Sequence, residues 1–97
     1  AIAGGRNIRT TDNRVFAPDP YAWSNVGLYV WNQTETAECS GHEVRGNRVF
    51  YVNAAGDSNP VWNAENCGPV AGWDDSNSWG DDTLTAAIWD EPFAACE

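Results

Sequence analysis

Alternation of apolar and polar residues along the chain marks several short strands. The clearest runs are 26–31 (VGLYVW), 48–53 (RVFYVN) and 83–89 (TLTAAIW), because β-branched and aromatic residues of this kind favour strands. Shorter runs at 14–17 and 43–44 predict two further strands. No window of helical length shows an apolar period of 3.6 residues. The pattern therefore predicts an all-β protein.

Glycine, proline and asparagine separate these runs, a spacing typical of a β-sandwich or barrel. We expect residues 1–97 to form a single β-sandwich domain. We expect a loose arm or edge strand at 1–13 and an irregular segment at 54–73. Strand alternation predicts the core residues, which are Val26, Leu28, Val30, Val49, Tyr51, Leu84, Ala86 and Ile88.

Three cysteines, an odd number, predict one intrachain disulfide and one remaining thiol. Either bridge between successive cysteines would add about 3–4 kcal/mol of stability in the chain-entropy model. We favour Cys39–Cys67, which leaves Cys96 free or linking two chains, so the protein is a monomer or a disulfide-linked dimer. No two cysteines form a Cys-x-x-Cys pair, which argues against a zinc site.

The net charge of −9 is unevenly distributed. All five basic residues are arginines between Arg6 and Arg48, whereas every charged residue from Ala54 onward is acidic. Such a surface repels phosphate backbones and anionic lipids, so we expect neither nucleic-acid nor membrane binding. The chain starts at Ala1 and holds no methionine, which we interpret as a secreted, mature product whose export signal has been removed.

The acidic segment before the last predicted strand carries a resemblance to a known family. Residues 81–86, Asp-Asp-Thr-Leu-Thr-Ala, resemble the calcium motif of βγ-crystallin Greek-key domains, with alanine at the last position where serine is usual. Leu28-Tyr29 with Ser40-Gly41 resembles the family's opening hairpin, and 12–17 is a poorer second copy of the motif. With the cysteines, the resemblance implies a small, disulfide-containing Greek-key β-sandwich.

The resemblance also implies a calcium site, since this cation takes six to eight hard oxygen ligands. The implied ligands are Asp81, Asp82, Thr83 and Thr85, completed by Asp12 and Asn13. The alternative is a solvated acidic turn that leads into a strand. An EF-hand is excluded in this region, because Trp79 and Ala86 occupy positions where that motif needs ligands.

Six tryptophans are many for a chain of 97 residues. Tryptophan faces stack on sugar rings, and neighbouring carboxylate and amide groups bond sugar hydroxyls. This combination predicts a carbohydrate site, made by Trp73, Trp79, Asp74, Asp75 and Asn77. The alternative is that large aromatic side chains fill the core of a small domain.

Three functions remain open, and we expect none to be enzymatic, because no carboxylate pair or nucleophilic set stands out. The first is a secreted calcium-binding module. The second is a protein-binding inhibitor or toxin that presents the loop 54–66, since the superfamily that the chain resembles includes small secreted bacterial metalloproteinase inhibitors and killer toxins. The third is a carbohydrate-binding module. The expected partners are calcium and a secreted protease or a polysaccharide.

Overall fold

The computed structural model describes residues 1–34 and 38–89. Within them the chain forms short strands and one 3-10 helix, η1. The elements are β1 Gly5–Arg6, β2 Arg9–Thr11, β3 Arg14–Ala17, β4 Leu28–Val30, β5 Cys39–Ser40, β6 Glu43–Arg45, β7 Arg48–Tyr51, β8 Val61–Asn63, β9 Ser78–Trp79 and η1 Ala86–Trp89. The expected strand-rich fold is confirmed for these residues. No described helix has the length and apolar character needed to cross a membrane.

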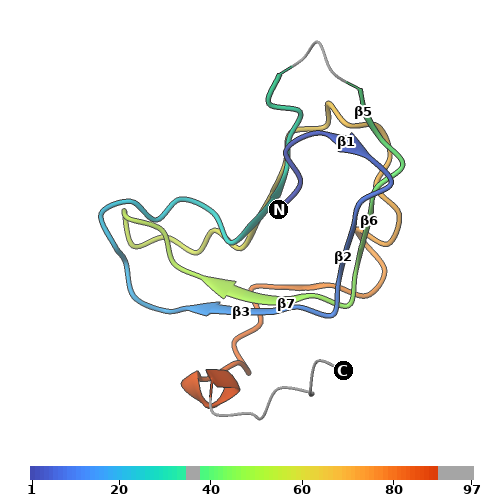
Figure 1. Ribbon diagram of the computed structural model, residues 1–97. Coiled ribbons are helices and arrows are strands. Elements are labelled where there is room, and N and C mark those ends of the chain that lie inside the picture. Colours follow the sequence, from blue (N-terminus) through green and yellow to red (C-terminus); the bar gives the residue numbers. More distant parts are fainter. Residues whose placement is uncertain (35–37, 90–97) are drawn as a thin grey trace.

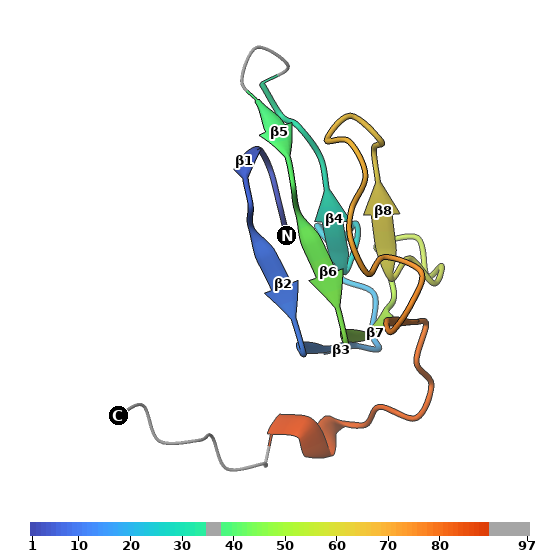
Figure 2. The same ribbon diagram turned by 90° about the vertical axis from the view of Figure 1, so that its right-hand side faces the viewer.

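The chain winds in successive turns, and each strand of the first turn pairs in parallel with the equivalent strand of the second turn. β1 pairs with β5, β2 with β6, β3 with β7 and β4 with β8, while β9 adds to the other edge of β7. The paired strands lie side by side as the chain winds (Figures 1 and 2). We name residues 2–34 the first coil, 38–68 the second coil and 69–84 the third, partial coil. The architecture is a short parallel β-solenoid, in which each coil packs on its neighbours.

An internal sequence repeat accounts for this stacking. The tetrapeptide Asn-Arg-Val-Phe occurs at 13–16 and again at 47–50, and the strand register sets the two copies opposite each other. The phenylalanines of the two copies, Phe16 and Phe50, have ring centroids 5.9 Å apart. Self-similarity at a fixed period is the sequence signature of stacked repeats. Strand prediction from alternation alone treats the two copies as unrelated and so misses the stacking.

The expected Greek-key topology is not confirmed. All pairings between the named strands are parallel, and the one antiparallel contact among the described residues is the isolated bridge Val52–Ser58. A Greek key needs antiparallel neighbours, whereas a strand that pairs with its equivalent one coil later runs parallel to it. Alternation indicates which residues form strands, but it does not indicate the direction of their partners.

The interior of the solenoid holds inward-facing side chains from both complete coils. Its buried apolar members are Ile2, Leu28, Val30, Cys39, Val44, Val49 and Cys67. The prediction of a buried side chain is confirmed for Leu28, Val30, Val49 and Leu84. Val26, Tyr51 and Ile88 are half-buried, and Tyr51 packs against the core. Ala86 is exposed, so its prediction as a core residue is wrong.

A ladder of asparagines crosses the coils beside this core. Asn47 is fully buried, and its Oδ1 accepts hydrogen bonds from the backbone N–H and the Nδ2 of Asn13 at 3.1 and 3.0 Å. Its Nδ2 donates to the carbonyl of Thr10 and to Oδ1 of Asn77, both at 2.9 Å. Because an amide group both donates and accepts, the ladder satisfies buried polar groups on three coils and fixes their register.

The segment 83–89 is not a strand, which corrects the prediction from its alternation. Ala86–Trp89 form η1, and Oγ1 of Thr85 accepts a hydrogen bond from the Ala87 N–H at 3.3 Å. Thr85 therefore caps a turn that begins with two alanines, the residue with the highest helix propensity. Leu84 is buried and holds the segment against the solenoid. The preceding acidic residues lie in a turn and do not lead into a sheet.

Candidate functional site

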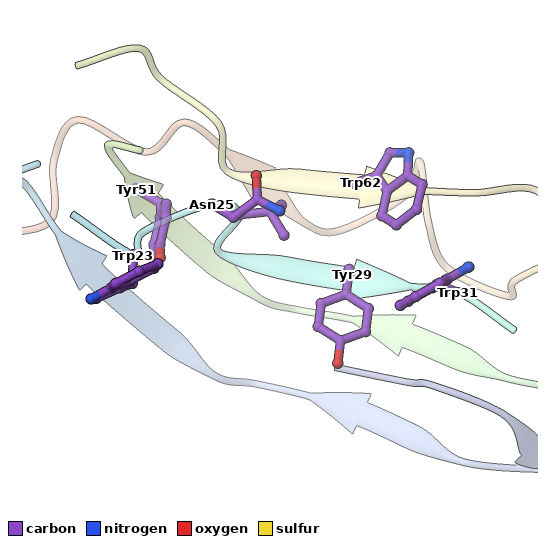
Figure 3. A pocket seen from close by; sticks show the side chains of 7 residues that line it. Trp23, Asn25, Tyr29, Trp31, Tyr51 and Trp62 are labelled. Atoms are coloured by element: carbon purple, nitrogen blue, oxygen red, sulfur yellow. The ribbon is translucent and has the colours of Figure 1, made fainter. Parts of the chain in front are cut away.

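Aromatic side chains gather on the outer face of β4 and β8. In β4, Leu28 and Val30 are buried, so Tyr29 between them faces outward. The strand register places Tyr29 opposite Trp62, whose side chain is 46% exposed. Trp31 follows β4, and its ring centroid lies 5.9 Å from that of Trp62. These three rings come from neighbouring coils and line one pocket (Figure 3).

The opposite end of this pocket is formed by the segment that connects β3 to β4. Trp23 in that segment is 96% exposed, and it lines the pocket together with Tyr51 of β7 (Figure 3). The pocket has a volume of about 320 Å³. We call its lining the aromatic groove, which consists of Trp23, Asn25, Val26, Tyr29, Trp31, Tyr51 and Trp62.

Asn25 adds a polar group to the groove, and its bond with Asn59 ties the two coils together. Asn25 lies within the groove, and with Asn59 and Trp62 it also lines an adjoining hollow of about 280 Å³. Nδ2 of Asn59 donates to the backbone carbonyl of Asn25 at 2.6 Å. The N–H of Gly27 donates to the carbonyl of Asn59 at 3.1 Å. These bonds hold the walls of the groove through the backbone of Asn25, so its side-chain amide is not used in them.

The tryptophans that the sequence singled out for sugar binding lie in another region. The rings of Trp73 and Trp79 pack on each other, with centroids 5.2 Å apart, and both pack against the core. Both are only partly exposed, because much of each ring covers the interior. The two rings are neighbours, as a shared site requires. Their position against the core matches the alternative, in which large aromatic side chains fill core volume.

The polar residues predicted beside them have separate roles. Nδ2 of Asn77 donates to backbone carbonyls at 2.8, 2.9 and 3.1 Å, as the last member of the asparagine ladder. Asp75 forms an ion pair with Arg45 at 3.3 Å. Asp74 lines a pocket with Trp73 that is distinct from the aromatic groove. The predicted sugar-binding residues therefore do not form one platform.

The residues implied as calcium ligands fall into two groups with the second coil between them. Asp12 and Asn13 belong to the first coil and bond to the second, through Arg45 and Asn47 respectively. The other group, Asp81, Asp82, Thr83 and Thr85, follows β9, at the end of the third coil and immediately after it. Asp82 and Thr83 are exposed, and Thr85 caps η1.

Asp81 already has a counter-ion. Its carboxylate accepts a hydrogen bond from Nε of Arg48 at 2.7 Å and one from the Thr83 N–H at 3.0 Å. The Arg48 bond, with those from Thr83, holds the pKa of Asp81 well below its ordinary value. Arg48 also donates to the Thr83 hydroxyl at 2.8 Å. The carboxylate thus clamps the third coil to β7 of the second.

The predicted Cys39–Cys67 disulfide is present and closes the second coil. His42 beside it is 1% exposed. The Ile8 N–H donates to its Nδ1 at 3.2 Å, so the proton of a neutral ring sits on Nε2, which donates to Sγ of Cys39 at 3.2 Å. The two sulfurs are bonded to each other and Nε2 is protonated, so this buried cluster cannot ligate a metal in its oxidised form. Cys96 and the dimer link expected from it lie outside the described residues.

Sequence reasoning selected tryptophans by their acidic neighbours and so missed the exposed set. The signal that could have found Tyr29 and Trp31 is their alternation with the buried Leu28 and Val30. What alternation cannot show is that Trp62, far along the chain, belongs to the same surface.

Comparison with known proteins found no matching family model, no matching curated protein and no matching solved structure.

Proposed function

We propose that this protein is a non-enzymatic carbohydrate-binding module, and that the aromatic groove is its binding site. The observation that carries the proposal is the set of exposed rings around one pocket, with Trp23 at 96% and Trp62 at 46% exposure. The face of an aromatic ring is electron-rich, and it attracts the weakly positive C–H groups that cover one face of a pyranose ring. The Asn25 amide can donate to and accept from sugar hydroxyls.

The exposure of these rings supports a binding role. Large apolar side chains gathered on one surface are unusual in a monomer and mark interaction sites. A fully exposed ring such as Trp23 adds little to folding, because burial of apolar area is what stabilises the folded state. A mostly apolar pocket with a few directed polar groups is also the usual form of a small-ligand site.

Binding without cleavage fits the composition of the groove. Glycoside hydrolysis uses two carboxyl groups that flank the scissile bond. The seven lining residues include tryptophan, tyrosine, asparagine and valine, and none has a carboxyl group. The net charge of −9 also disfavours nucleic-acid bases as the stacking partner, because the phosphates would be repelled.

The proposal is tested by affinity electrophoresis of the folded protein in gels that contain soluble glucans, mannans or xylans. We expect at least one polysaccharide to retard the protein and Trp62→Ala to weaken binding by about 0.5–1.5 kcal/mol, or roughly 2- to 13-fold. Tyr21→Ala is the matched control, because Tyr21 is 67% exposed but does not line the groove. Unchanged migration in every gel, or an equal loss for Tyr21→Ala, would refute the proposal.

A protein partner is the second candidate, since exposed tryptophan and tyrosine are also the residues enriched at binding hot spots. A secreted protease is the partner that the sequence suggests. Inhibition of one member of a protease panel, lost on Trp62→Ala and kept on Tyr21→Ala, would favour this function over sugar binding. Retention in a polysaccharide gel with no inhibition would favour the first.

Calcium binding at 81–85 stays a prediction. Metal that binds only the folded state raises the melting temperature by mass action. A calcium module should therefore melt higher in millimolar calcium than in chelator, and Asp82→Asn should reduce the difference. An unchanged melting temperature together with no heat in titration calorimetry would end the calcium hypothesis.

A further inference from the structure

We infer that the aromatic groove selects uncharged glycans and rejects chains that carry carboxylate or sulfate groups. This inference rests on the proposed function and names the class of sugar that the site takes. It follows from three features of the molecule: the chemistry of the lining, the positions of the arginines and the field of the whole chain.

The lining contains no group that could neutralise an anion. Its polar atoms belong to uncharged hydroxyl, amide and indole groups, whereas the strong, charge-assisted bonds to a carboxylate or sulfate come from arginine or lysine. An anionic sugar placed against the exposed faces of Trp31 and Trp62 would lose water and gain no counter-ion. Removing a charge from water without a partner is costly, so the groove favours sugars that bear only hydroxyl groups.

The cations of the chain are positioned elsewhere. The chain has no lysine, and the arginines Arg6, Arg9, Arg45 and Arg48 form ion pairs, with Glu38, Glu43, Asp75 and Asp81 respectively among their partners. In each of these pairs the arginine belongs to one coil and the acid to the next. Arg14 lies on β3 and has an interaction of its own. The four paired arginines thus join coil to coil, and none of the five arginines lines the groove.

The electrostatic field of the whole protein adds to this preference for uncharged glycans. With a net charge of −9, the molecule repels an approaching polyanion, and screening reduces that repulsion over a Debye length of about 8 Å at physiological salt. An uncharged glycan experiences no such force. Its affinity should therefore be nearly independent of ionic strength, whereas residual binding of an acidic glycan should strengthen as salt is added.

The test is a glycan array with neutral, uronate-bearing and sulfated oligosaccharides, probed with the folded chain and with Trp62→Ala. We expect every binder that depends on Trp62 to be neutral. Calorimetry on the strongest neutral binder should give a Kd that changes less than twofold between 50 and 500 mM salt, by the screening argument. Acidic sugars of the same backbone should bind at least roughly tenfold more weakly at low salt, a difference of about 1.4 kcal/mol.

A variant that adds a positive charge to the groove should gain binding, a result that loss of folding could not produce. Asn25→Arg places a guanidinium in the groove at an exposed position and keeps the backbone carbonyl that bonds Asn59. We expect this variant to gain affinity for uronate-bearing sugars, and that gain should fall as salt rises. Acidic glycans that bind the unmodified groove as well as neutral ones would overturn the inference and leave the proposed function standing. No binding to any sugar would overturn both.

Discussion

The asparagine ladder predicts the largest single effect of a polar substitution in this protein. Asn47→Ala removes a side chain that is fully buried and that makes four hydrogen bonds. Two are accepted from Asn13, and two are donated to Thr10 and Asn77. Two of these partners, Thr10 on the first coil and Asn77 on the third, are half-buried, so they lose these bonds without full access to water.

The magnitude follows from those four bonds. A hydrogen bond contributes about 1 kcal/mol net, and a buried group left unsatisfied costs about 1–3 kcal/mol. Asn47→Ala should therefore lower the free energy of unfolding by about 4 kcal/mol, a large part of the 5–15 kcal/mol typical of a domain. With a urea slope of about 2 kcal/mol/M, the unfolding midpoint falls by roughly 2 M.

Urea unfolding monitored by tryptophan fluorescence measures this change. Asn13→Ala is the matched control, because Asn13 is exposed at the end of the ladder and its side chain donates one bond to Asn47. We expect the control to lose about 1 kcal/mol. A loss below about 1 kcal/mol for Asn47→Ala, or equal losses for the two variants, would show that the ladder does not hold the coils in register.

Further predictions concern the disulfide, one turn and acid stability. Replacing Cys39 and Cys67 together by alanine should cost about 3–4 kcal/mol, measured by thermal unfolding; a melt insensitive to the replacement contradicts this. Gly46→Ala, at φ 67° and against an acidic side chain of the first coil, should cost about 1–3 kcal/mol. A Cβ added at Gly56 meets nothing within 4 Å, so Gly56→Ala measures the penalty of the positive φ alone. Equal losses of stability for the two variants would show that the Cβ at position 46 makes no costly contact. The lowered pKa of Asp81 contributes stability above its unfolded pKa that is lost as pH falls below about 4. Asp81→Asn should therefore flatten the acid limb of a stability–pH curve, and an unaltered limb would contradict the clamp.

Much of the strand content was predictable from local pattern. The run RVFA coincides with β3 Arg14–Ala17, and the runs at 26–31 and 48–53 contain β4 and β7. The inward positions Leu28, Val30 and Val49 were also predictable, because successive side chains of a strand face opposite sides. The prediction failed at 83–89, where a capping threonine and two alanines outweigh an apparent alternation. It also failed within 54–73, which was expected to be irregular and contains β8 Val61–Asn63.

The candidate site was less predictable, for a reason that lies in the distance along the chain. Trp62 is adjacent to Tyr29 only through the pairing of β4 with β8, and no local pattern near either residue encodes that pairing. The repeated Asn-Arg-Val-Phe tetrapeptide does predict that the two coils stack, with equivalent residues 34 positions apart. It does not give the residue opposite Tyr29, because a spacing of 34 would place Asn63 there, whereas the structure places Trp62.

By itself, the sequence determined the strands β3, β4 and β7, the sides their residues face, a chain rich in aromatic residues and a charge that becomes acidic toward its second half. Only the tertiary structure decided that the strands stack in parallel, that Trp73 and Trp79 cover the core, and that Trp23, Trp31 and Trp62 surround a pocket. The physical reason is that side-chain direction is set by the local backbone, whereas exposure is set by what the next coil covers.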